Sequence, residues 1–223
     1  MSPETLTREQ IVKTAVELLD EEGLEGLNMR ALGKRLGSAP AATYWHVKNK
    51  RDLVALASEH VWKELALPEL SQENWRAAAA TMATNFRALL IRHTWLLQVF
   101  GAYVVYGHER ARHDDHNLAI FEAAGFSSAM ALLAATAVAN FVIGNALTFS
   151  GKAVVKRELR RKGQDAAAHI QNRISKFSEI ARQYPHLRHL LVNEKASGAA
   201  TDESFEFGLR AMLDGIGSQL TRT

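Results

Sequence analysis

Apolar residues recur along most of the chain at intervals of three and four, and the 223 residues include only 14 glycines and 4 prolines. That spacing places apolar side chains on one face of a helix, whereas a strand would need strict alternation. We therefore expect an all-α fold. The first helix shows the pattern well, because Thr7 and Gln10 form a capping-box pattern and Gly23 is expected to end the helix. Its apolar face carries Ile11, Ala15, Leu18 and Leu19.

Three shorter helices are expected next in the N-terminal part. One runs from Asn28 to Gly37, and another begins at Ser38. Gly37 permits the left-handed conformation that a sharp turn between helices needs, so these two helices predict a helix-turn-helix. A fourth helix is expected to open at Asn49 and to run through Val61.

The same periodicity predicts longer helices further along the chain. We divide it into an N-terminal domain, residues 1–65, and a C-terminal helical domain, residues 66–223. Residues 151–165 are rich in charge and are predicted to form a mobile connection. The helices expected in the C-terminal domain cover residues 74–93, 94–107 and 115–125, the charge-free stretch after Gly125, and residues 177–191 and 202–220.

Positive charge is concentrated in one block of the N-terminal domain. The whole chain has a net charge of only +3, but between Gly26 and Arg51 there are six cations and no acid. Such a block in a nearly balanced chain indicates one surface for an anionic partner. Because the block covers the predicted helix-turn-helix, the expected partner is double-stranded DNA. The six cations are Arg30, Lys34, Arg35, Lys48, Lys50 and Arg51.

Composition excludes several classes of site. The chain has no cysteine, which removes disulfides, thiolate zinc sites and cysteine nucleophiles and is typical of a reducing compartment. The first ten residues lack the basic-then-apolar pattern of a secretory signal, so we expect a cytoplasmic protein. Residues 123–151 carry no charge and could span a bilayer by length. Their high alanine content, with Ser, Asn and Thr, favours a helix buried in a core or subunit interface instead.

The stretch TYWHVKNKR, Thr43 to Arg51, combines aromatic rings, a histidine and three cations. Together with the helices around it, over about Leu6 to Leu65, it resembles the TetR family of transcriptional regulators. Weaker likeness to the tetracycline-repressor branch continues through NFRALLIRH, AAGFS and FEFGLRAMLDGI, in that order. The resemblance implies a homodimeric repressor that binds an inverted-repeat operator and is released when a small molecule binds its C-terminal domain.

On this resemblance, one side of the stretch faces DNA and the other faces the core. Lys48 and Lys50 are expected to meet phosphate, while Trp45 packs inward. Tetracycline repressors carry Gln-Pro-Thr where this chain has residues 40–42, Pro-Ala-Ala, so the operator sequence does not carry over. The predicted DNA-contacting residues are Arg30, Ser38, Ala39, Pro40, Ala41, Ala42, Thr43, Tyr44, His46, Lys48 and Lys50.

The ligand half departs from the tetracycline repressors. They hold a magnesium–drug chelate with a histidine and a nearby acid, and Phe100 and Thr148 occupy those places here. We therefore predict no tetracycline, no magnesium and no other cofactor. The remaining side chains suit a largely apolar or aromatic small molecule, although each ring could equally fill a helical core. The predicted ligand-contacting residues are Met82, Asn85, Phe86, Phe100, Tyr103, Asn117, Phe121, Asn140, Phe141 and Thr148.

The HDDH run at 113–116, with His108 nearby, could bind a divalent metal in principle. It is expected where a helix begins, and Asp is favoured there for capping, so we predict no metal site. No phosphate loop, metal-binding helix pair or nucleophile motif is present, which disfavours an enzyme. A DNA-binding dimer without a ligand, or one controlled by a protein partner, stays open. The dimer is expected to form through the charge-free helix and the last helix, both rich in small residues.

Overall fold

The computed structural model describes residues 6–37, 47–70, 73–102, 106–161, 163, 165–188 and 199–220. Within these ranges every regular element is a helix, which confirms the all-α prediction. The helices are α1 (Arg8–Gly26), α2 (Met29–Arg35), α4 (Lys50–Trp62), α5 (Trp75–Arg92), α6 (Trp95–Ala102), α7 (His108–Ala123), α8 (Ser128–Arg161), α9 (Ala166–Ala181) and α11 (Ala199–Gly217). The domain division that we predict at residue 65 falls between α4 and α5.

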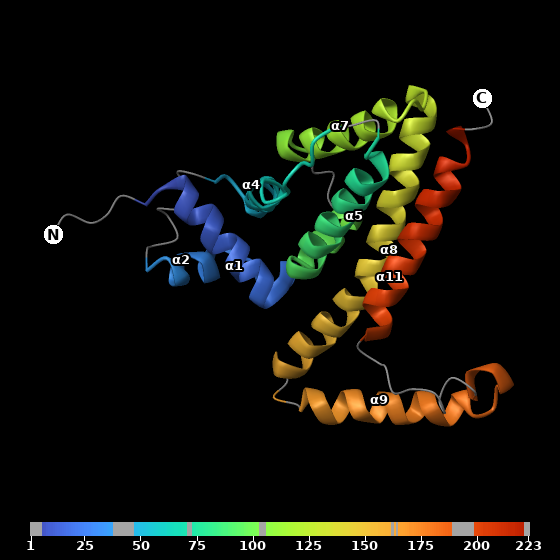
Figure 1. Cartoon of the computed structure of the whole chain (residues 1–223). Coiled ribbons are helices and arrows are strands. Elements are labelled where there is room, and N and C mark those ends of the chain that lie inside the picture. The colour runs from blue at the N-terminus through green and yellow to red at the C-terminus, as the bar shows by residue number, and fades with distance from the viewer. Residues whose placement is uncertain are drawn as a thin grey trace.

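Helices α1, α2 and α4 form a small unit at one end of the molecule (Figure 1). Each begins at a predicted cap: Thr7 forms the complete capping box, and the side chains of Asn28 and Asn49 accept from Ala31 N and Asp52 N at 2.8 and 2.9 Å. These caps satisfy backbone N–H groups that would otherwise lack partners. The unit is held by fully buried residues of α1 and α4, among them Ile11, Leu19, Leu53, Val54 and Ala57.

Two glycines in this unit have positive φ. Gly37, after α2, has a φ of 62°, as the predicted turn requires. Gly23 was expected to end the first helix, and the helical backbone is interrupted there. The φ of 72° and ψ of −176° at Gly23 are non-helical and produce a kink, after which a short helical segment runs to Gly26. Leu27 N closes the last turn by donating to Gly23 O at 3.3 Å.

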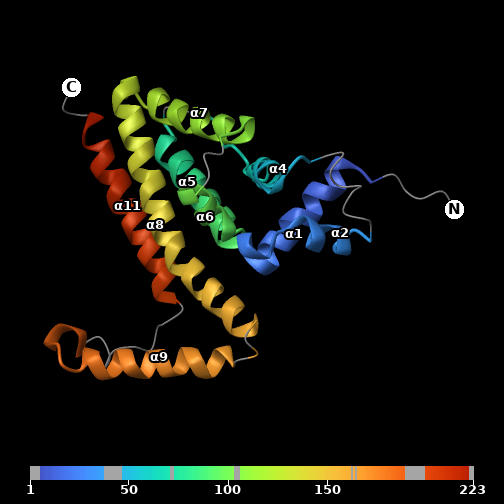
Figure 2. The ribbon, with the colours of Figure 1, turned by 180° about the vertical axis from the view of Figure 1, so that it is seen from behind.

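The C-terminal bundle is built around α8, which runs beside α5 and α7 on one side and α11 on the other (Figures 1 and 2). The predicted mobile connection over residues 151–165 is wrong, because α8 continues as a helix to Arg161. Its last turns are fastened to α1 by arginines. Arg157 Nη2 donates to Asp20 O at 3.2 Å and to Thr94 Oγ1 at 2.7 Å, and Arg160 pairs with Glu22 at 2.6 Å.

Two other helices begin earlier than expected. Helix α7 starts at His108 because the carboxylate of Glu59, from α4, accepts from the backbone N–H groups of His108 and Glu109 at 2.8 and 2.9 Å. The HDDH run therefore lies inside a helix and not at its start. Helix α9 starts at Ala166, since the side chain of Asp165 caps it by accepting from Ala167 N at 2.8 Å.

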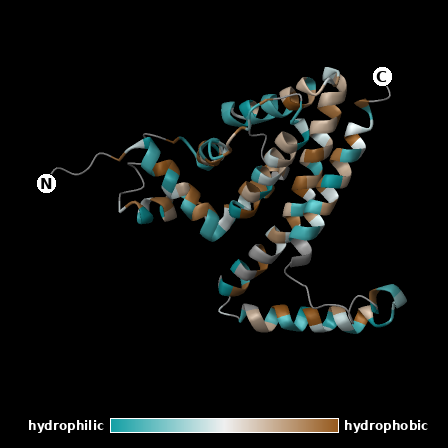
Figure 3. Ribbon diagram, viewed as in Figure 1, coloured by the Kyte–Doolittle hydropathy of each residue, from teal (hydrophilic) through white to brown (hydrophobic). Residues whose placement is uncertain are grey.

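Several apolar side chains remain exposed in the single chain. The hydropathy colouring of Figure 3 shows apolar positions among polar ones along α9. Helix α9 lies across the end of α8, away from the rest of the bundle, and its apolar side chains are 40–56% exposed. The outer face of α8 and one position of α11 also carry exposed apolar side chains. Ser128–Gly151 is long and apolar enough to cross a membrane by length and composition alone, and a third of the stretch is buried inside the bundle. The exposed side chains are Ile170, Ile174, Phe177 and Ile180 of α9, Leu132, Leu133 and Leu147 of α8, and Phe207 of α11.

Candidate DNA interface and ligand site

The described part of the predicted DNA interface consists of three cations. Arg30 is exposed on the first turn of α2, and Lys48 is exposed in the turn before α4. Lys50 is half-buried, and its ammonium donates to Leu24 O at the end of α1 at 2.5 Å. The predicted contacts Ser38, Ala39, Pro40, Ala41, Ala42, Thr43, Tyr44 and His46, as well as Trp45, lie outside the described residues.

One further cation of the basic block binds within the domain. Arg35 forms a two-pronged ion pair with Glu21, with N–O distances of 2.6 and 2.5 Å. The hydrogen bond from Arg35 holds the pKa of Glu21 below its ordinary value. Arg30, Lys34, Lys48 and Arg51 are left exposed. The surface available to an anion is therefore smaller than the six-cation block suggested.

The far end of α4 enters an aromatic group made by three helices of the C-terminal bundle. Trp62 is 4% exposed and stacks on Phe86 of α5 with ring centroids 5.3 Å apart. The edge of Phe100 from α6 and the ring of His113 from α7 lie 6.4 and 5.2 Å from the same indole. We call Trp62, Phe86, Phe100 and His113 the Trp62 cluster. It connects the DNA-binding unit directly to α5, α6 and α7.

Charged groups border the Trp62 cluster on the α7 side. The guanidinium carbon of Arg110 lies 4.8 Å from the ring centroid of Phe100 and 5.8 Å from that of Trp62, a cation–π arrangement. Arg110 also lies 3.5 Å from Asp114. Burial alone would raise the pKa of Asp114, but hydrogen bonding from His113 and the charge of Arg110 outweigh it and lower that pKa.

The structure brings four of the predicted ligand residues to this place. Phe86 and Phe100 belong to the Trp62 cluster itself. Met82 is buried one turn before Phe86 on α5, and Asn117 is buried one turn after His113 on α7. Asn85 lies nearby but lines a separate groove of about 140 Å³ beside the end of α4.

The remaining predicted ligand residues are not brought to the Trp62 cluster. Phe121 packs with Trp75 and Phe126 at the other end of α7, at centroid distances of 5.9 and 6.0 Å. Phe141 stacks on Phe205 of α11 at 5.5 Å. Asn140 and Thr148 are exposed on α8, because they lie on the face of that helix that turns away from the bundle. Tyr103 lies outside the described residues.

Sequence reasoning did not assign His113, Arg110 or Glu59 to the ligand site. The cause was the misplaced start of α7, which put His113 in a loop. In a helix that starts at His108, His113 and Asn117 are four residues apart and lie on the same buried face as Ile120 and Phe121. That spacing was the signal that could have found them. Among the described residues no group of three or more His, Asp or Glu side chains could hold a metal ion.

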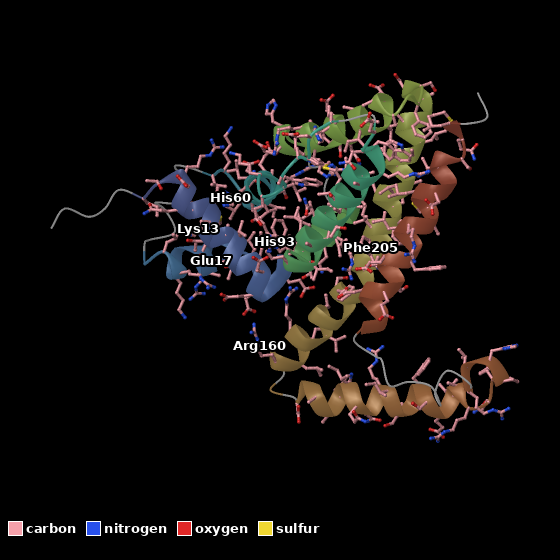
Figure 4. The ribbon with its side chains drawn as sticks, viewed as in Figure 1. Lys13, Glu17, His60, His93, Arg160 and Phe205 are labelled. Carbon is pink, nitrogen blue, oxygen red and sulfur yellow. The ribbon has the colours of Figure 1, made fainter. Side chains whose placement is uncertain are left out.

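A second contact joins the DNA-binding unit to the bundle, at the end of α1. Asp20 Oδ1 accepts from Trp95 Nε1 and lies against Nδ1 of the buried His93, both at 2.8 Å. Arg157 of α8 reaches the backbone oxygen of the same Asp20. Figure 4 shows His93 beside the end of α1 and Arg160 at the far end of α8. We call Asp20, His93, Trp95 and Arg157 the Asp20 junction.

A small helical unit with an exposed basic surface, whose last helix packs against the aromatic interior of a second helical domain, defines a DNA-binding regulator with a separate sensing domain. Residues 11–57 match the family described as "Bacterial regulatory proteins, tetR family", and residues 67–220 match "Tetracyclin repressor-like, C-terminal domain". The chain therefore belongs to the TetR family of transcriptional regulators, as its sequence predicted.

Individual relatives agree with this membership. An HTH-type transcriptional regulator of Saccharopolyspora erythraea is 30% identical, over 95% of this chain and 84% of its own. The HTH-type transcriptional repressor DrrR1 of Streptomyces coeruleorubidus is also 30% identical, over 95% of this chain and 77% of its own. The crystal structure of the Streptomyces coelicolor TetR family protein ActR in complex with actinorhodin has a TM-score of 0.74 and 26% identity, covering 97% of this chain and 96% of that chain.

Proposed function

We propose that the protein is a cytoplasmic, ligand-responsive repressor that binds an inverted-repeat operator as a homodimer and leaves it when a largely aromatic small molecule binds. The observation that carries this proposal is the course of α4. Its 13 residues span about 20 Å, from the Asn49 cap beside Lys48 to Trp62 inside the cluster. A ligand that displaces Trp62 would therefore move the helix that supports the DNA contacts.

The link between α4 and α7 supports the same mechanism. The Glu59 carboxylate holds the N-terminus of α7, and Gly107 leaves it room, since a Cβ at that position would overlap the Glu59 side chain. A displacement of α7 on ligand binding would thus be transmitted to α4 through a charge-assisted contact as well as through packing. Two recognition surfaces whose separation changes would no longer match half-sites about 34–36 Å apart.

The proposed dimer uses the outer faces of α8 and α11. Some of the small residues expected at this interface are buried within the subunit instead, namely Ala131, Ala134 and Ala135. Gly208 packs on the Phe141 ring of the same chain, where an added Cβ would lie 2.7 Å from it. Larger exposed apolar side chains, Leu132, Leu133, Leu147 and Phe207, supply the apolar area that a stable interface needs.

Operator binding is tested with DNA from directly upstream of the coding region, by fluorescence anisotropy at several salt concentrations. Lys48→Gln removes an exposed cation at the DNA end of α4, and Lys63→Gln removes a matched exposed cation at the other end. We expect Lys48→Gln to weaken binding by about tenfold and to reduce the salt slope by about one, because one phosphate is no longer neutralised. Lys63→Gln should change neither quantity. Equal effects of the two variants would contradict the proposed DNA surface.

The release step is tested on the same complex. Aromatic small molecules are titrated into the protein–operator complex at constant salt, and the fraction of bound DNA is followed. Release at a saturable ligand concentration supports the proposal. Operator affinity that no bound ligand changes would reduce the function to that of a DNA-binding dimer without an effector.

A further inference from the structure

One nitrogen of the Trp62 cluster has no hydrogen-bond partner. His113 is 4% exposed, and its Nε2 is completely buried without any partner in the part of the chain that the structure describes. A buried polar atom that loses its bonds to water costs about 1–3 kcal/mol when nothing replaces them. An apolar residue would fill this position at lower cost, so the nitrogen offers a hydrogen-bonding position for a ligand.

The other nitrogen of the ring determines what that partner must offer. His113 Nδ1 faces the Asp114 carboxylate at 3.5 Å, so in a neutral imidazole the ring proton lies on Nδ1, where it can be donated to the carboxylate. Nε2 is then a hydrogen-bond acceptor, so it requires a donor. The ring lies between Trp62 and Phe86, with centroid distances of 5.2 and 5.5 Å, so a donor that reaches Nε2 must come on a flat or apolar framework.

A second polar side chain lies on the same face of α7. Asn117 is 9% exposed and lies one turn beyond His113. Its amide offers both a donor and an acceptor. A buried nitrogen without a partner among the described residues, which lies beside aromatic rings and one turn from a buried amide, has the character of a small-molecule site with a few polar groups in an apolar wall.

We infer that the effector is an aromatic molecule with a hydroxyl group, which donates its hydrogen bond to Nε2 of His113 while the ring system packs among Trp62, Phe86 and Phe100. The inference rests on the proposed ligand-responsive function and names the chemical class of the ligand. His113 selects the hydroxyl, and Asn117 holds a second polar group of the same molecule. A carboxylate does not fit at Nε2, because it has no proton to donate, and Arg110, the cation that borders the cluster, already lies 3.5 Å from Asp114.

The test compares three probes that share one ring system: naphthol, its methyl ether and naphthoate. Binding to the full-length dimer is measured by isothermal titration. We expect naphthol to bind about tenfold more tightly than the ether, because only naphthol can donate a hydrogen bond to the buried Nε2 of His113. Equal binding of naphthol and its ether, tighter binding of naphthoate, or no binding of any probe would each overturn the inference.

Two variants on the same helix sharpen the test. His113→Phe keeps a ring of similar size but has no polar atom, so it should abolish the preference for naphthol over the ether. It should also raise the melting temperature of the ligand-free protein, because the unpaired nitrogen is gone. A merely structural histidine would instead leave the naphthol preference unchanged, and this result would contradict the inference.

His116→Phe is the matched control. Nε2 of His116 already has a partner, the backbone oxygen of Pro68 at 2.7 Å. This variant should lower the melting temperature and keep the naphthol preference. Operator binding by the ligand-free protein is measured separately: its absence would refute the proposed function, whereas the comparison of naphthol with its ether tests His113 alone.

Discussion

The two contacts between the DNA-binding unit and the bundle differ in their chemistry. The Trp62 cluster, at the end of α4, is made of stacked and edge-on rings. The Asp20 junction, at the end of α1, is made of hydrogen bonds and charge, with its two bonds to Oδ1 at 2.8 Å. Ring packing keeps much of its energy through a small shift, whereas a hydrogen bond is broken when its geometry changes. We therefore expect α1 to act as the pivot and α4 as the moving arm when a ligand binds.

Trp62→Ala should have the largest effect on stability. It removes a buried indole that contacts three helices, and we expect the free energy of unfolding to fall by about 3–5 kcal/mol. Because the packing around the indole is apolar, the decrease measured by urea denaturation should be the same at low and high salt. Trp62→Phe, which keeps a ring, serves as the control and should be less destabilising. A decrease that varies strongly with salt would contradict the apolar description of this cluster.

Asp20→Ala should come next, because it strands two buried donors, Trp95 Nε1 and the His93 ring, without an acceptor. We expect a loss of about 2–3 kcal/mol in urea denaturation. Asp20→Asn keeps one oxygen that can accept from Trp95 and should lose less. If both variants stayed within about 0.5 kcal/mol of the unmodified protein, the Asp20 junction would not be a pivot.

Gly107→Ala should be milder and should act between the two domains. The added Cβ displaces the Glu59 carboxylate from the N-terminus of α7, with an expected cost of about 1–2 kcal/mol. The operator affinity of the ligand-free dimer should change less than the response to ligand, which is measured by anisotropy. Gly151→Ala, on α8 with no atom near its Cβ position, is the control and should be neutral or stabilising. A ligand response preserved in Gly107→Ala would remove Glu59 from the mechanism.

Arg160→Gln should have the smallest effect. The ion pair of Arg160 with Glu22 lies at the edge of the Asp20 junction, and the arginine side chain is 61% exposed. Exposed pairs contribute little, so we expect less than about 0.5 kcal/mol in urea denaturation, decreasing further at high salt. A loss as large as that of Asp20→Ala would mean that the surface pair, and not the buried acceptor, holds α1.

The sequence predicted what local chemistry determines. The caps at Thr7, Asn28 and Asn49 start helices where expected, because each side chain accepts from a backbone N–H only three residues further on. Its errors have distant causes. The acid that starts α7 is Glu59, which lies 49 residues before His108 in the chain.

The extension of α8 has a similar cause. In the sequence, Arg157 and Arg160 resemble the charged residues of a loop. In the structure, Arg157 binds the backbone oxygen of Asp20 and the hydroxyl of Thr94, and Arg160 pairs with Glu22. Such contacts between positions more than a hundred residues apart, as for Arg160 and Glu22, leave no mark in the local pattern. The burial of His113 and Asn117 on one face of α7 could not be predicted for the same reason, because it depends on where that helix starts.

The exposed apolar side chains of α8, α9 and α11 also bear on how much repressor a cell contains. A newly made subunit presents these side chains to water. Pairing through the outer faces of α8 and α11, as proposed above, would remove the subunit from the pool open to aggregation and proteolysis. At low abundance the amount of dimer follows the square of the subunit concentration, so halving synthesis reduces the dimer by about fourfold. Occupancy of an operator by such a protein would respond more steeply to its own expression than that of a monomeric regulator.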